Sequence, residues 1–203
     1  MKKILFLITL VFTTNTYSQD LFFEYSKSIS KFDFETNQYE KLNIEGQNGN
    51  SFSLGLKIKK SNKLGVGFNV AYDENNAKSL VNQSKYIWET GYISTNGLVN
   101  YDVLNLGNKV NVNSEFIIGA SHIIYGNQYI NNVKYNIKNH PEFKGIFLNY
   151  GFSLGLTFKS NSKYSFRVAY NYDIKNRISK TKTDSKINKF KNSGFSIRLL
   201  NLL

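Results

Sequence analysis

Residues 148–174 read LNYGFSLGLTFKSNSKYSFRVAYNYDI, and this stretch decides the fold. Apolar or aromatic side chains occupy every second position of residues 148–158 and again of residues 164–174, with small or polar residues between them. Strict alternation over nine or more residues gives a β-strand one apolar and one polar face, whereas a helix would scatter these side chains around its circumference. Residues 160–163, between the two halves, are polar and fit a tight turn, so the stretch predicts a β-hairpin.

A second hairpin with the same chemistry lies earlier in the chain. Residues 52–58 and 64–72 alternate in the same way, and Phe52-Ser53-Leu54-Gly55-Leu56 repeats the five residues that begin at Phe152. Four weaker segments complete a count of eight strands: residues 23–29, 86–104, 110–124 and 195–199. In the second of these the alternation slips between its two halves, which predicts a β-bulge or an extension beyond a bilayer.

The connections between these strands alternate in length. Three are short and polar, at residues 61–63, 105–109 and 160–163. Four are long, at residues 35–49, 73–85, 126–145 and 175–191. In an up-and-down barrel, odd and even connections lie at opposite ends, and outer-membrane barrels have short periplasmic turns and longer extracellular loops. The sequence therefore predicts an all-β fold, an eight-stranded antiparallel up-and-down transmembrane β-barrel.

The first residues have a different composition. Lys2 and Lys3 precede a short apolar run at residues 4–12, and Thr16-x-Ser18 offers a small-x-small cleavage site. This is the architecture of a secretory signal peptide, and the run is too short to span a bilayer. We expect residues 1–18 to be the signal peptide and residues 19–203 to be the barrel domain, exported to a bacterial outer membrane.

Alternation alone does not say which face of the strands is inside. A soluble, secreted, lipocalin-like barrel would turn the apolar face inward. Two features favour the membrane. The polar face carries charged residues, and aromatic residues gather near strand ends, as interfacial girdles require. The charged residues are Glu24, Lys57, Glu115, Arg167 and Arg198; the aromatic ones are Tyr25, Tyr72, Tyr150, Phe158, Tyr164 and Tyr172.

With its signal peptide, its rhythm of three turns and four loops, and segments such as Phe152-Ser153-Leu154-Gly155-Leu156, the chain resembles the small eight-stranded outer-membrane β-barrels. These are the OmpX and OmpA-barrel type and the PorT-like outer membrane β-barrel domain proteins. The resemblance covers essentially the whole chain after the signal peptide. Because its motifs are common to many barrels, it implies an architecture and a location in the cell envelope rather than a specific activity.

Several function classes are disfavoured. The chain has no Cys and two His, which argues against thiolate or zinc chemistry, and we expect no metal and no cofactor. Ser121 and His122 are neighbours on a strand, so they point to opposite faces and cannot act as a dyad. His140 stands alone in a loop. The formal charge of +12 suggests anionic partners, but an exported chain with its basic residues in loops and turns is not a nucleic-acid binder.

The interior of an eight-stranded barrel is just wide enough for side chains to fill. Glu24, Glu115, Arg167 and Arg198 are all assigned to this interior, and we expect glutamate–arginine ion pairs there because an unpaired buried ion is costly. The sequence thus predicts a non-enzymatic barrel with a plugged lumen. It would be a structural or interaction protein that acts through its extracellular loops, alone or as a subunit of a larger outer-membrane complex. The alternative is a small-solute pore.

One loop is a candidate binding surface for anions or for an acidic partner. Residues 175–191 hold seven basic residues and a single acidic one, Asp184. Lys180, Lys182, Lys186 and Lys189 would lie at the level of lipopolysaccharide phosphates and carboxylates. Ile178, Ile187 and Phe190 suggest that the segment packs on something, whereas the alternative is a solvated loop whose charges only limit aggregation.

Overall fold

The computed structural model describes residues 19–36, 44–81, 83–140, 143–160, 163–178 and 185–202. The predicted signal peptide, residues 1–18, lies outside the described residues. The described part forms nine strands: β1 (Gln19–Thr36), β2 (Ile44–Lys59), β3 (Leu64–Val81), β4 (Ser84–Leu106), β5 (Val110–Ile130), β6 (Val133–Asn136), β7 (Ile146–Lys159), β8 (Tyr164–Arg177) and β9 (Ser185–Leu202). It contains no helix long and apolar enough to cross a membrane.

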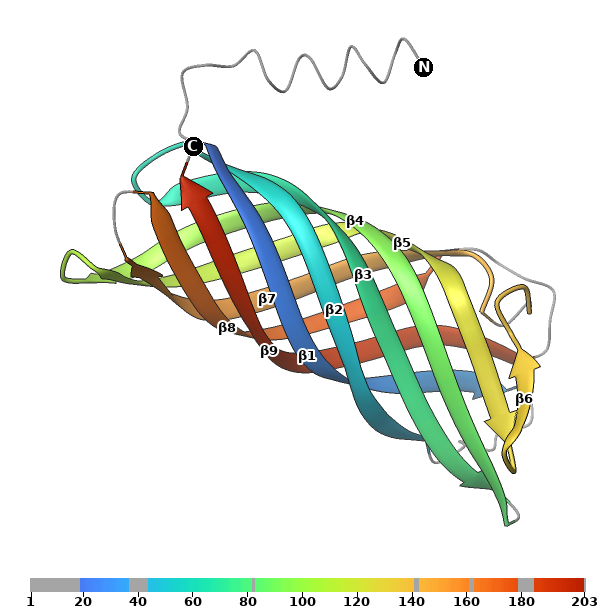
Figure 1. Cartoon of the computed structure of the whole chain (residues 1–203). Helices are drawn as coiled ribbons and strands as arrows, with labels where there is room; N and C mark the ends of the chain where they lie inside the picture. The colour runs from blue at the N-terminus through green and yellow to red at the C-terminus, as the bar shows by residue number, and fades with distance from the viewer. Residues whose placement is uncertain are drawn as a thin grey trace, which may run out of the picture.

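Eight of these strands close into a ring. Each pairs antiparallel with its neighbours, in the order β4-β3-β2-β1-β9-β8-β7-β5, and a further β4–β5 pairing closes the barrel. The short β6 adds to the outer end of β5 and takes no part in the ring. The predicted eight-stranded up-and-down barrel is confirmed (Figure 1).

The apolar face of the strands points outward. On β2, Leu54 is 62% exposed whereas its neighbour Ser53 is 6% exposed, and the same alternation runs along the other ring strands. The exposed belt includes Leu21, Phe23, Leu54, Phe68, Val70, Val99, Phe116, Ile118, Phe152, Leu154, Phe166, Val168, Phe195, Ile197 and Leu199. Tyr25, Tyr164 and Tyr172 are exposed at the margins of this belt. A closed barrel with an apolar exterior and a polar interior is a membrane-spanning structure, so the soluble alternative is wrong, and the chain lies in a bacterial outer membrane.

The strands are longer than the sequence pattern predicted at one end. Residues 73–85 are not a long loop, because β3 continues to Val81 and β4 begins at Ser84. The expected loops 35–49, 126–145 and 175–191 are likewise shortened by strand extensions. Beyond the bilayer both faces of a strand can be polar, so the backbone ladder continues after the alternation has stopped.

The three predicted turns are confirmed, whereas the slipped alternation of residues 86–104 does not come from a bulge between its two halves. β2 and β3, β4 and β5, and β7 and β8 are joined by tight connections at one end of the barrel (Figure 1). Gly107, in the second of these turns, has a φ of 69°, a left-handed conformation that glycine adopts without steric cost. The register of β4 against β5 shifts between Gly91 and Tyr92, where the extra residue is Ile124 of β5, and again between Asp102 and Leu104. Every second residue of β4 from Trp88 to Asn100 nevertheless stays buried, so the strand keeps one facing. The apolar pattern slips because Trp88 and Tyr92 are apolar side chains on the inward face.

Candidate functional site in the barrel lumen

Toward the short-turn end, the lumen holds an ion-pair triad made by three of the predicted interior residues. Arg198 of β9 donates from Nε to Glu24 of β1, its cross-strand neighbour. Its Nη1 and Nη2 donate to the two carboxylate oxygens of Glu115 of β5, each over 2.7 Å. Arg198 and Glu115 are 2% and 1% exposed, and the guanidinium lies 4.3 Å from the centroid of the Phe22 ring. A bidentate pair of this kind combines charge with fixed geometry and joins opposite walls of the barrel.

Arg167 occupies the same level but makes neutral contacts. It is the cross-strand neighbour of Arg198, and its Nε and Nη2 donate to Asn113 and Ser153 over 2.5 and 2.8 Å. Its remaining nitrogen, Nη1, is buried without a hydrogen-bond partner among the described residues. The four predicted residues therefore lie together, with charges that balance, but the direct ion pairs join only Glu24, Glu115 and Arg198.

A second polar layer lies closer to the outer end, and the sequence analysis missed it. Lys175 of β8 forms an ion pair of 2.8 Å with Asp73 of β3, and Ser51 and Ser94 each donate to Asp73 over 2.5 Å. Both charged residues were assigned to loops. The signal was present: Asp73 continues the inward-facing positions of β3, and Lys175 those of β8. Lys175 thus belongs to the lumen and not to the outer basic loop. The loop therefore carries one basic residue fewer than the sequence analysis expected.

A cavity of 90 Å³ lies between the two layers. Glu24, Asn96, Asp73 and Lys175 are among its lining residues. Both ion-pair layers therefore face one polar space inside the barrel.

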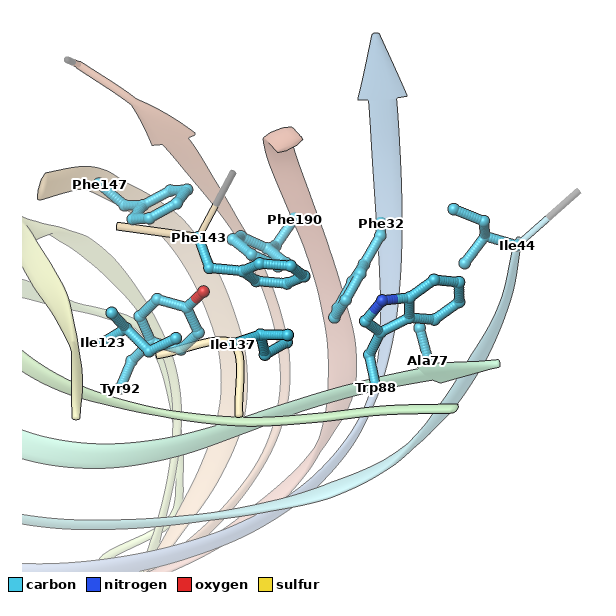
Figure 2. Packing of buried hydrophobic residues seen from close by; sticks show 10 residues of the cluster. All are labelled: Phe32, Ile44, Ala77, Trp88, Tyr92, Ile123, Ile137, Phe143, Phe147 and Phe190. Carbon is cyan, nitrogen blue, oxygen red and sulfur yellow. The ribbon is translucent and has the colours of Figure 1, made fainter. Parts of the chain in front are cut away.

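An aromatic cluster lies in the outer end of the lumen, and we call it the outer plug. Phe190 of β9 is fully buried at its centre, with ring centroids of Phe32, Tyr92 and Phe147 4.7, 5.4 and 5.1 Å away. The outer plug comprises Phe32, Ile44, Ala77, Trp88, Tyr92, Ile123, Ile137, Phe143, Phe147 and Phe190 (Figure 2). Ile137 and Phe143, which come from between β6 and β7, contribute side chains to this cluster.

The predicted basic surface is only partly within the described residues. Lys180 and Lys182 lie outside them. Lys186 and Lys189 lie on β9, not in a loop, and Lys189 is half-buried. Phe190 packs in the outer plug, as its position suggested, whereas Ile178 is 59% exposed.

The serine and the two histidines that the sequence analysis rejected as a catalytic set are separated. Ser121 is buried in the lumen and donates to Asn149 over 2.9 Å, whereas the exposed His122 contacts the carbonyl oxygen of Gly145. His140 lies in the segment between β6 and β7. In the ranges that the structure describes, no group of three or more His, Cys, Asp or Glu side chains could hold a metal ion.

Comparison with known proteins identifies the architecture. No family model matches the chain, and no curated protein sequence matches it. Neisserial surface protein A matches with a TM-score of 0.50 and 12% identity, over 88% of this chain and 96% of that one. OprG from Pseudomonas aeruginosa matches with a TM-score of 0.46, 11% identity and coverage of 89% and 95%. Ail of Yersinia pestis, in complex with the heparin analogue sucrose octasulfate, matches with a TM-score of 0.44, 16% identity and coverage of 91% and 98%.

At these identities the likeness concerns the fold. The match to the Neisserial protein extends over most of both chains, and it agrees with the closed ring and the exposed apolar belt described above. The chain therefore has the fold of the small outer-membrane β-barrels.

Proposed function

We propose that the protein is a non-conducting, non-enzymatic barrel that acts in the outer membrane as a structural or interaction protein through its outer rim. The carrying observation is the filling of the lumen. The outer plug covers the mouth, and the Arg198 triad joins opposite walls of the lumen. A pore would need a continuous water-filled path, and both layers lie across that path.

Planar-bilayer recording tests this proposal. The protein purified from outer membranes is expected to give no stable conducting steps of porin size. A variant with Phe143→Ala, Phe147→Ala and Phe190→Ala removes three rings of the outer plug but keeps the triad, and we expect it to stay closed. Adding Arg198→Ala should then produce small, voltage-sensitive steps. Porin-sized steps from the unmodified protein would support the pore alternative instead.

The outer rim supplies the interaction surface in this proposal. β3, β4 and β5 continue beyond the belt, and β6 adds a further exposed strand to β5 (Figure 1). Lys186 and Lys189 lie on β9 toward its outer end, and Lys180 and Lys182 precede them in the chain. In this proposal these lysines bind anionic groups of lipopolysaccharide or an acidic partner of a larger complex. Nucleic acid is not a partner in this proposal.

Substitution of these lysines tests whether the outer rim binds an anionic partner. Replacing Lys180, Lys182, Lys186 and Lys189 by Gln should reduce the anionic glycolipid, or a protein partner, that co-purifies after gentle extraction at low salt. A matched variant with Lys59, Lys60, Lys63 and Lys109 replaced by Gln changes the charge equally at the opposite end and should leave the outer partner unchanged. Equal retention by both variants would exclude the rim lysines as the binding surface.

A further inference from the structure

A cavity lies at the short-turn end of the barrel. It has a volume of 370 Å³ and is lined by residues from both walls, so it occupies the mouth at that end. Leu200, which packs with Phe22 and Leu98 in a small apolar cluster, forms part of its lining. We call this cavity the periplasmic cup, because short turns face the periplasm in bacterial outer-membrane barrels.

The periplasmic cup has a surplus of positive charge. Its charged lining residues are Lys57, Lys59, Lys63, Lys159, Asp20 and Asp102. No ion pair joins these six groups in the described part of the chain. Lys57, the deepest lysine, instead donates from Nζ to the side-chain oxygen of Asn100 over 2.7 Å. Four ammonium groups around a concave space with two carboxylates concentrate positive potential there and favour an anion.

Asp20 places a second, independent requirement on the ligand. It is 9% exposed, and its Oδ1 has no hydrogen-bond partner among the described residues. A buried carboxylate oxygen without a donor is unfavourable, so a ligand that supplies an O–H or N–H group would remove this cost. The ligand that fits must therefore carry a donor beside its negative charge.

We propose that the periplasmic cup binds a small hydroxylated anion, such as a sugar phosphate or a hydroxy acid. The lysines contact the phosphate or carboxylate, and Asp20 accepts a hydrogen bond from a hydroxyl group. The volume lies within the range of about 300–1,000 Å³ that is usual for small-molecule sites. Because the triad and the outer plug close the lumen beyond the cup, the ligand enters and leaves from the periplasm.

Titration calorimetry on the protein purified from outer membranes, in uncharged detergent at low salt, tests the lysines. Glucose 6-phosphate should bind at least about tenfold more tightly than glucose. Lys57→Gln and Lys159→Gln should each weaken this binding about fivefold. Lys109→Gln is the matched control, because Lys109 lies beside Lys159 at the same rim, where its carbonyl accepts the Lys159 N–H, but does not line the cup. It should change the affinity less than twofold.

Asp20→Ala tests the hydroxyl contact with pyrophosphate as the second probe. This variant should weaken glucose 6-phosphate binding and leave pyrophosphate binding equal or stronger, since a negative charge is removed. Heat-dependent gel migration checks that each variant is folded. Absence of phosphate binding, or equal weakening by Lys109→Gln and Lys159→Gln, would overturn the site. If Asp20→Ala changes the affinities for glucose 6-phosphate and pyrophosphate by the same factor, Asp20 does not contact a hydroxyl group of the ligand.

Discussion

At the residue scale, the stability of the lumen depends on how each buried charge is compensated. Arg198 serves two carboxylates, so its removal would leave Glu24 and Glu115 buried without a counter-ion. Arg167 is equally buried but donates to the neutral side chains of Asn113 and Ser153. Breaking a buried ion pair by removing one partner costs about 3–5 kcal/mol, whereas losing hydrogen bonds to neutral groups costs about 1–3 kcal/mol. The two arginines are cross-strand neighbours, so substitutions at these two positions can be compared directly.

Arg198→Met should lower the free energy of unfolding by about 3–5 kcal/mol, and Arg167→Met by a smaller amount. Urea unfolding in detergent micelles, followed by the fluorescence of Trp88, the one tryptophan of the chain, measures both values. Equal losses of unfolding free energy in the two variants would mean that the ion pairs of Arg198 stabilise the lumen no more than the neutral hydrogen bonds of Arg167.

At the element scale, the sequence predicted strands well where the bilayer imposes alternation and poorly beyond it. The three turns and the inward position of Arg198 follow from a period of two. Asp73 and Lys175 were assigned to loops because the apolar half of the pattern stops near them, although their strands continue. The burial of Phe190 by residues of β1, β4 and β7 depends on contacts between distant segments, which periodicity along one strand does not encode.

The segment between β6 and β7 should cover the mouth without holding the barrel together. Replacing Ile137 and Phe143 by Ala removes two buried side chains of the outer plug and leaves every ladder of the ring intact. We expect stronger acrylamide quenching of Trp88, which is buried in this cluster, while the heat-dependent gel shift is retained. Val133→Ala, on the exposed β6, is the control and should leave quenching unchanged. Unchanged quenching in the double variant would mean that this segment does not cover Trp88.

At the scale of the whole molecule, the ring explains both location and stability. A closed barrel has no free edge, and its backbone groups are satisfied by neighbouring strands. The protein should therefore fractionate with the outer membrane and migrate faster in detergent gels when unboiled than when boiled. Recovery as a soluble periplasmic protein would contradict this expectation. The fold could be predicted from the sequence because one bilayer constrains all strands alike, whereas a ligand or partner depends on a few residues at the two rims.

The most direct measurement is cysteine labelling, since the natural chain has no cysteine. Single variants Ser53→Cys, Leu54→Cys, Lys63→Cys and Lys138→Cys place a thiol in the lumen, on the belt, at a short turn and at the outer end. With a membrane-impermeant maleimide, Lys138→Cys should react on intact cells, and Lys63→Cys only after permeabilisation. Ser53→Cys should stay unreactive in both cases, and Leu54→Cys should react only with a lipid-soluble reagent. Rapid labelling of Ser53→Cys by the impermeant reagent would show an open lumen and contradict the plugged lumen.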